Sequence, residues 1–151
     1  MNLDVIIEQR FYRCVDGKYW TENSFPYDFW LRYLMTFESI IIIARVKDIV
    51  TPEQGWRRVD GENVSFDALP YYLGPKEFVL KLPKLIRKLR KLSYESEAVI
   101  LRIPSALSII YFIINLFGAK NKFAVEVVGD PEDGFSSGAS SSSLSYFYSF
   151  I

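Results

Sequence analysis

Residues 98–128 read AVILRIPSALSIIYFIINLFGAKNKFAVEVV, and this stretch decides the fold class. It contains an apolar run at Ala98–Ile103, a helix-like segment at Ser105–Phe117 and a second apolar run at Phe123–Val128. Gly118 stands where such a helix would end. A strand, a helix and a strand in this order form the repeating unit of a parallel sheet. Because the runs do not alternate with polar residues, we expect strands that are covered on both faces.

The same two patterns extend toward the N-terminus. Further strand-like runs and helix-like stretches precede this unit, and they are Leu3–Ile7, Tyr27–Phe37, Ser39–Ala44, Val64–Leu69 and Lys76–Leu92. A long loop is expected from Glu8 to Trp20, and a turn over Asp60–Asn63. The resulting order predicts an α/β protein, with a Rossmann-like, mostly parallel sheet and flanking helices.

The chain divides into one predicted domain and a tail. Residues 1–135 form the Rossmann-like domain, which is a normal size for a single core. Residues 136–151 read SSGASSSSLSYFYSFI, with eight serines and no charge. We interpret this segment either as a flexible tail or as an aberrant end produced by a frame shift after Gly138 or Ala139, because its aromatic residues are unusual in a linker.

The composition excludes several kinds of protein. The 151 residues contain no histidine and a single cysteine, Cys14, which rules out a disulfide framework, a typical zinc site and catalysis by Ser-His-Asp or Cys-His groups. Lysine plus arginine balances aspartate plus glutamate at 18 each, which argues against a nucleic-acid partner. The lone cysteine indicates a reducing compartment, and we expect a cytoplasmic protein.

Two helical segments leave a membrane role open. Residues 103–119 carry no charge over 17 positions, which suits a buried helix or a short membrane insertion. The segment Lys76–Leu92 has an apolar stripe and a basic face, which suits a solvated surface, contact with anionic lipid or contact with nucleic acid. Peripheral contact with the inner face of the membrane is therefore an expectation. Pro83 should kink the second segment or divide it in two.

Polar side chains follow the predicted strands, where ligands bind in open α/β sheets. The loop after the first strand offers Arg10, Tyr12, Asp16 and Gly17, and guanidinium groups suit phosphate or carboxylate. Arg102 and Glu126 lie in two apolar runs, so they can pair or point together into the crevice if these strands are neighbours. Gly129 and Asp130 follow the last strand, in a turn-forming sequence that carries only a weak signal for a metal.

Several blocks together resemble a known family. They are Glu8-Gln9-Arg10-Phe11-Tyr12, Asp16-Gly17-Lys18-Tyr19-Trp20, Ala44-Arg45-Val46, Leu69-Pro70-Tyr71-Tyr72, Leu101-Arg102-Ile103-Pro104-Ser105 and Val125-Glu126-Val127-Val128-Gly129-Asp130-Pro131. In this order they resemble the N-terminal domain of bacterial GT-B glycosyltransferases of the subfamily 4-like kind, which assemble surface polysaccharides. The resemblance spans about residues 1–139.

This resemblance implies an acceptor-binding domain. A sugar or lipid-linked acceptor would bind here, while the nucleotide-sugar donor would bind a separate C-terminal domain, without an obligatory metal or other cofactor. The acceptor-side residues that it implies are Arg10, Tyr12, Asp16, Gly17, Arg102, Ser105, Gly129 and Asp130. It also implies that this chain is a truncated enzyme, which lacks the C-terminal donor domain and transfers no sugar by itself.

The sequence leaves one alternative from another class. The alternative to the glycosyltransferase domain is a stand-alone α/β protein that associates with a membrane or binds a small ligand without catalysis. A nucleotide-binding version of that alternative is disfavoured, because the chain has neither a Gly-x-Gly-x-x-Gly fingerprint nor a Gly-Lys-Ser/Thr phosphate loop.

Overall fold

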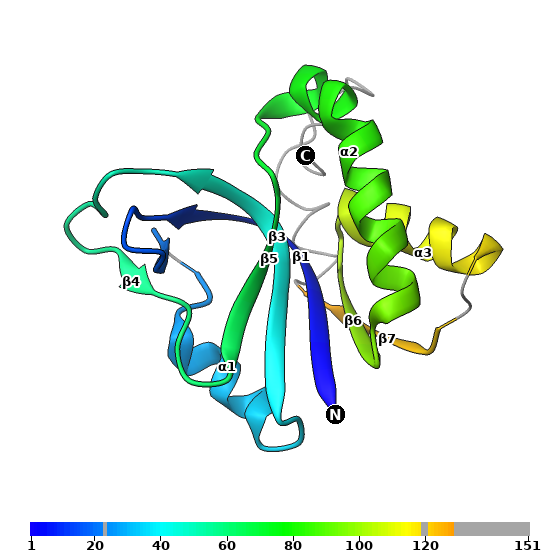
Figure 1. Cartoon of the computed structure of the whole chain (residues 1–151), viewed down its shortest axis with the longest axis horizontal. Helices are drawn as coiled ribbons and strands as arrows, with labels where there is room; N and C mark the ends of the chain where they lie inside the picture. The colour runs from blue at the N-terminus through cyan, green and yellow to red at the C-terminus, as the bar shows by residue number, and fades with distance from the viewer. Residues whose placement is uncertain (23, 119–120, 129–151) are drawn as a thin grey trace, which may run out of the picture.

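The computed structural model describes residues 1–22, 24–118 and 121–128 (Figure 1). The strands are Asn2–Arg13 (β1), Tyr19–Thr21 (β2), Ser39–Asp48 (β3), Arg57–Arg58 (β4), Val64–Pro70 (β5), Ala98–Ile103 (β6) and Phe123–Val127 (β7). The helices are Tyr27–Leu34 (α1), Gly74–Glu95 (α2) and Ala106–Phe117 (α3). The predicted tail over residues 136–151 lies outside the described residues.

Five parallel strands form the main sheet. They lie in the order β5, β3, β1, β6, β7, with β1 at the centre. The chain first builds outward from β1 to β5 and then returns to the other side of β1 for β6 and β7. The prediction of an α/β fold with a mostly parallel, Rossmann-like sheet is confirmed.

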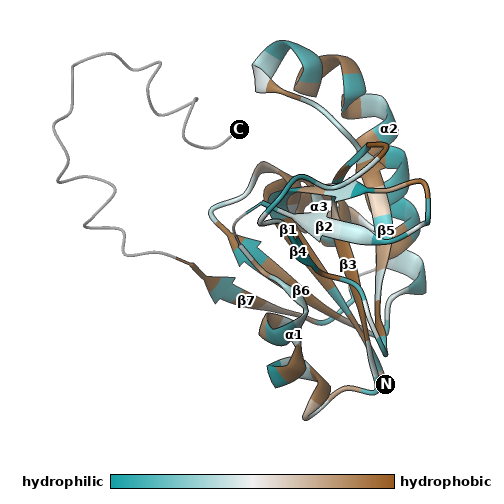
Figure 2. Cartoon of the chain, turned by 90° about the vertical axis from the view of Figure 1, so that its left-hand side faces the viewer, coloured by the Kyte–Doolittle hydropathy of each residue, from teal (hydrophilic) through white to brown (hydrophobic). Residues whose placement is uncertain are grey.

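Helices cover both faces of this sheet (Figure 2), and a separate core of buried side chains lies on each face. Trp30 of α1 is fully buried against Val5 and Ile42 on one face. On the other face Leu85 of α2 and Leu107 of α3 are fully buried in a cluster with Ile6 and Ile43. Because successive side chains of a strand point to opposite faces, the apolar runs of β1 and β3 supply both cores at once.

The prediction of a long loop after the first strand is wrong. β1 continues to Arg13 and turns at Asp16-Gly17 into the antiparallel strand β2, which pairs with β4. The strand continues because its edge is paired with β3 up to Asp48 and Phe11 is buried in the core, although Glu8, Gln9 and Arg10 are polar. We call β2, β4 and the β1–β2 turn the wing, and it projects from the left of the sheet in Figure 1.

A bulge makes this continuation possible. Ile6 pairs with Ile43 and Arg10 with Arg45, so residues 7–9 of β1 lie opposite Ala44 alone. Such extra residues bend a strand and redirect its side chains. The bulge lies where β6 leaves β1, since β6 pairs with β1 only as far as Ile6.

Pro83 does not divide α2. The helix runs without interruption from Gly74 to Glu95, with Pro75 in its first turn and Pro83 inside. Proline removes the hydrogen bond to the carbonyl group four residues earlier, here that of Val79. Both Pro83 and Val79 are exposed, so water can solvate that carbonyl group and the helix persists.

The apolar segment before Gly118 is helical but only half buried. α3 buries Leu107, Ser108, Tyr111 and Asn115, whereas its opposite face is exposed, including Phe117 at 84%. The expectation of a buried helix is therefore wrong for that face. Among the described residues, no helix is both long enough and apolar enough to cross a membrane.

Candidate functional site

The carboxyl ends of β1, β3, β5 and β6 meet at one edge of the sheet. The chain changes direction between β1 and β6, and the crevice beyond such a point is where open α/β sheets bind ligands. A cavity of about 210 Å³ lies here between these two strands and the end of β7. Its lining residues are Ile7, Glu8, Gln9, Phe25, Arg102, Ile103, Pro104 and Val128.

Glu8 in the bulge is at the centre of a polar network. Its Oε2 accepts hydrogen bonds from the Leu107 amide at 3.1 Å and from Ser105 Oγ at 3.2 Å. Ser105 in turn caps α3, because its Oγ accepts the Ser108 amide at 3.1 Å. The carboxylate of Glu8 thus occupies the N-terminus of α3, where a helix favours a negative charge.

The second carboxylate oxygen of Glu8 binds groups from the other side of β1. Oε1 accepts a hydrogen bond from the Tyr72 hydroxyl and lies 3.6 Å from Arg45 Nη2. The Arg45 guanidinium packs 4.5 Å from the centre of the Tyr72 ring, and its Nη1 donates to the Tyr72 carbonyl group at 3.2 Å. Burial, together with the Glu8 charge, raises the pKa of Tyr72 well above its ordinary value, so its hydroxyl stays protonated and remains a donor.

A second charged group lies on the α1 side of the same crevice. Arg102 and Glu126 are register partners on β6 and β7, with Nε 2.9 Å from Oε2. Glu126 also accepts hydrogen bonds from Arg32 Nη2 and the Tyr33 hydroxyl, each at 2.7 Å. Of the two arrangements that the sequence left open for Arg102 and Glu126, the structure shows the pair.

Arg102 retains donor capacity toward the cavity that it lines. Its side chain is only 6% exposed and packs against Phe25, with the guanidinium carbon 4.4 Å from the ring centre. Within the described part of the chain, its Nη1 is buried without a hydrogen-bond partner. Burial lowers the pKa of Arg102, the nearby charge of Glu126 opposes this shift, and the group remains a cation at neutral pH. A buried guanidinium with an unused N–H beside an aromatic ring can bind a hydroxyl or carboxylate of a ligand.

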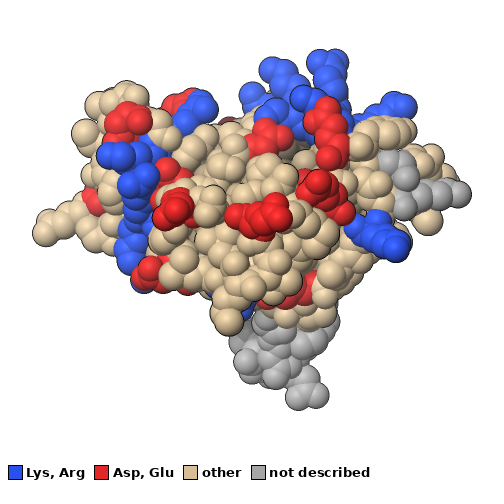
Figure 3. Space-filling view, turned by 60° about the horizontal axis from the view of Figure 1, so that its bottom comes forward, with Lys and Arg blue, Asp and Glu red and all other residues tan. Residues whose placement is uncertain are grey.

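A larger open hollow of about 460 Å³ lies farther along this edge, between the ends of β3 and β5 and the side of α2. It is lined by four cationic side chains, which are Arg13, Lys47, Lys81 and Lys88. Two of them are neutralised, since Arg13 pairs with Asp48 at 2.7 Å and Lys88 with Asp67 at 2.8 Å. Figure 3 shows one group of Lys and Arg side chains over α2 and another in a column at the left, on the side of the wing.

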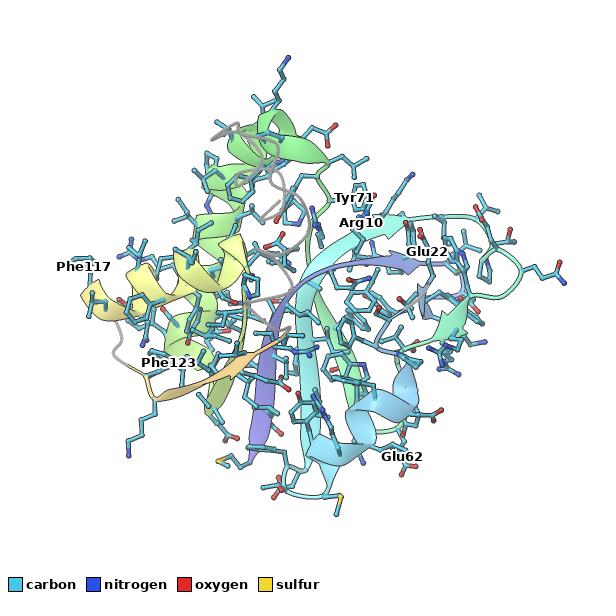
Figure 4. All side chains as sticks on the ribbon, turned by 180° about the vertical axis from the view of Figure 1, so that it is seen from behind. Arg10, Glu22, Glu62, Tyr71, Phe117 and Phe123 are labelled. Atoms are coloured by element: carbon cyan, nitrogen blue, oxygen red, sulfur yellow. The ribbon has the colours of Figure 1, made fainter. Side chains whose placement is uncertain are left out.

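The predicted site residues are divided between the crevice and the wing. Arg102 lines the cavity, and Ser105 reaches it through Glu8. Arg10 is exposed on β1 and lies at the same edge of the sheet as Tyr71 in Figure 4. Gly129 and Asp130 lie outside the described residues.

The other three predicted residues lie in or beside the wing. The Tyr12 hydroxyl donates to Glu22, and its ring packs 4.3 Å from that of Trp56. Asp16 pairs with Lys18 at 3.1 Å, and Gly17 has the positive φ of 82° that its turn requires. The contacts of the described residues join none of these three to the crevice.

Sequence reasoning did not select Glu8, Arg45, Tyr72 and Phe25 as site residues. Glu8 and Arg45 carry one available signal, since each is a charged residue directly after a predicted strand. Among the described residues, no group of three or more Cys, Asp or Glu side chains is arranged to hold a metal ion.

Comparison with known proteins gives one similarity. The chain is 34% identical over 114 residues to a Staphylococcus aureus protein named Protein CapJ. The match covers 74% of this chain and 28% of CapJ, so the chain spans little more than a quarter of that relative's length. No protein-family model matches the chain. No solved structure matches it.

Proposed function

We propose that this chain is the acceptor-binding domain of a glycosyltransferase that builds a surface polysaccharide or glycolipid. In this proposal the crevice between β1 and β6 holds the sugar or lipid-linked acceptor. A separate domain holds the nucleotide-sugar, and the chain alone transfers no sugar. The chain would work in the cytoplasm or at the inner face of the membrane.

The position of Glu8 carries this proposal. In dinucleotide-binding sheets the N-terminus of the helix after the switch point is free to hold a phosphate. Here Glu8 already places a carboxylate on the Leu107 amide, and that charge would repel a diphosphate. The crevice still offers Arg102 and the Phe25 ring, which suit the hydroxyl groups and the apolar face of a sugar.

The similarity to CapJ supports the broader part of the proposal. We take the relative's name as a pointer to capsule polysaccharide biosynthesis, which agrees with the glycosyltransferase resemblance of the sequence blocks. The matched segment covers 28% of CapJ, so we expect this chain to perform only part of the function of a full-length relative.

A glycan array with the purified chain tests the proposed acceptor site. We expect binding to at least one bacterial surface glycan and no binding of UDP-N-acetylglucosamine in a parallel titration. Arg102→Gln should weaken glycan binding about tenfold, because it removes the charge-assisted donor. The matched control is Arg32→Gln. Arg32 is the other arginine that binds Glu126, and Arg32 does not line the cavity. UDP-sugar binding without glycan binding would contradict the proposal.

A radiolabelled transfer assay tests the second part. The chain should leave UDP-, GDP- and dTDP-sugars unreacted with any glycan that it binds. Transfer by the chain alone would refute the dependence on a separate donor domain but leave acceptor binding intact.

A further inference from the structure

The outer face of α3 and the adjoining strand β7 form a continuous apolar surface. On α3 the residues Ile109, Phe112, Ile113, Leu116 and Phe117 are between 44% and 84% exposed. On β7 Val125 and Val127 are 50% and 63% exposed. We call these seven side chains the apolar seam. A contiguous exposed apolar surface of this kind usually marks an interaction site.

The two parts of the apolar seam lie on the same side of the sheet. The Phe123 ring at the start of β7 meets Phe112 of α3 edge to face, with ring centres 5.8 Å apart. Since side chains alternate along a strand, Val125 and Val127 point to that same side, whereas Glu126 points to Arg102. A hollow of about 240 Å³ separates α3 from β7, lined mainly by Phe112, Leu116 and Phe123. Figure 4 shows Phe117 at the free end of α3.

Within the part of the chain that the structure describes, no strand pairs with the outer side of β7. Among the described strands, β7 pairs with β6 alone. The Val128 amide donates to the Ile103 carbonyl group at 2.8 Å, so even-numbered residues face β6. Phe123, Val125 and Val127 therefore direct their N–H and C=O groups outward. Such an edge is a template for another strand.

These two features together select a polypeptide as the occupant. A lipid bilayer can cover apolar side chains, but it leaves the outward N–H and C=O groups of β7 without partners. A small ligand is too short to pair along the strand. α3 carries no charged residue, so the covering surface must itself be apolar. The match to CapJ leaves 72% of that relative outside the matched segment, which is a source for such a polypeptide.

We propose that the apolar seam and the open edge of β7 bind a further polypeptide segment. This segment corresponds to the part of CapJ that lies outside the match with this chain. This segment adds a strand to β7 and covers the outer face of α3 with apolar side chains. The inference rests on the sheet edge and does not depend on the acceptor proposal.

Hydrogen exchange of the full 151-residue chain is the first test. The amides of Phe123, Val125 and Val127 should exchange rapidly, while those of Ala124 and Glu126 are protected by β6. Protection of the odd-numbered amides in the isolated chain would overturn the proposal. If removal of residues 139–151 then abolished that protection, the chain's own C-terminal segment would be the occupant.

The second test uses CapJ without its matched 114 residues, co-expressed with this chain. We expect a one-to-one complex by native mass spectrometry, in which the odd-numbered amides of β7 become protected. Absence of a complex would overturn the proposal, as would a stable dimer of the chain that protects the same amides.

Three variants locate the contact. Val125→Pro removes one outward N–H without touching the bonds to β6, and Ile113→Glu places a charge in the apolar seam. Each should weaken the complex at least about tenfold while leaving the chain's melting temperature unchanged. Leu80→Glu on α2 is the matched control, because Leu80 is 78% exposed but lies outside the apolar seam. Equal affinity for all three variants would refute the location.

A vesicle experiment separates the membrane alternative. The chain should not float with phosphatidylglycerol vesicles through the apolar seam. Flotation that Ile113→Glu abolishes would show a lipid occupant and overturn the proposal.

Discussion

The carboxylate of Glu8 joins Tyr72 to Ser105 and the first turn of α3, although Tyr72 and α3 come from two separate parts of the chain. It can reach all of them because the bulge in β1 places it between β3 and β6. A carboxylate that accepts several hydrogen bonds in a buried site is costly to remove, since its partners lose their charge-assisted bonds.

Replacement of Glu8 by alanine should convert the crevice into an anion site. The Leu107 amide and Arg45 would lose this carboxylate, so inorganic phosphate should bind Glu8→Ala, whereas the parent chain should not bind it. We expect a loss of about 3 kcal/mol in stability and a melting temperature that rises with phosphate only in the variant. Thermal unfolding at 0 and 50 mM sodium phosphate, at constant ionic strength, measures this.

The exposed residue Glu38 supplies the control for this experiment. It pairs with the N-terminal ammonium group, far along the chain from the crevice, so Glu38→Ala should show no response to phosphate. An equal phosphate response in both variants would show a general salt effect.

Tyr111 presents the opposite case, a buried polar group that is not satisfied. Its hydroxyl is buried and has no hydrogen-bond partner among the described residues. Tyr111→Phe should therefore raise the free energy of unfolding at pH 7 by about 1 kcal/mol, as measured in urea. The exposed Tyr94 provides the control, since Tyr94→Phe should leave that free energy unchanged.

The same variant should alter alkaline unfolding. Burial, together with the nearby charge of Asp4, raises the pKa of Tyr111 to about 12 from its ordinary value of 10. Between these values the unfolded chain releases the proton and the folded chain retains it, so stability falls as pH rises. Urea unfolding at pH 10 and 11 should show a smaller fall for Tyr111→Phe than for the parent chain. An identical fall would mean that Tyr111 contributes nothing to it.

The sequence indicated the Arg102–Glu126 side of the crevice but not the network around Glu8. Arg102 and Glu126 are charges in apolar runs of consecutive strands, so their pairing required only that β6 and β7 be neighbours. Glu8 could not be found in this way, because its position depends on the bulge opposite Ala44. A bulge results from pairing between strands distant in sequence, and the local sequence does not determine it.

At the scale of elements, α2 shows that a helix tolerates an internal proline where the helix is exposed to water. Pro83 lies at a surface position where water can replace the lost backbone bond. Pro83→Ala should restore that bond and raise the free energy of unfolding by about 1–3 kcal/mol. Pro75→Ala is the matched control, because proline in the first helical turn costs no hydrogen bond. Urea unfolding of both variants measures the difference, and equal effects would contradict this explanation.

The strands of the main sheet and the helices that cover it were predictable because their apolar runs are long enough to require burial. Runs such as Ala98–Ile103 are long and strongly apolar, and burial between two layers is the only favourable arrangement for them. The wing was not predictable, because β2 and β4 contain three and two residues and carry no periodic pattern. The exposed face of α3 was also unpredictable, since a segment that is apolar on all sides does not show which of its faces packs against the sheet.

At the scale of the whole molecule, the two cores share β1 and β3, whereas the wing is attached at the end of β1 and by Tyr19, whose ring stacks on Phe66 of β5 with the ring centres 4.0 Å apart. Residues 3–6 of β1 pair with β3 on one side and β6 on the other and lie between two layers of helices. Their amides should exchange only on global unfolding. Trp20 and Thr21 lie in β2, which pairs over two residues with the end of β1 and over two residues with the exposed strand β4, so their amides should exchange through local opening.

Native-state hydrogen exchange at increasing urea concentrations distinguishes these modes. Exchange of the Val5 amide should accelerate steeply with urea, because global unfolding exposes a large surface, while exchange at Trp20 should change little. If both amides instead followed one urea dependence, the wing would belong to the same cooperative unit as the sheet. Independent opening would mean that Asp16 and Gly17 can move relative to Arg102 without unfolding the crevice. A ligand that protected the wing amides would then have to contact both regions at once.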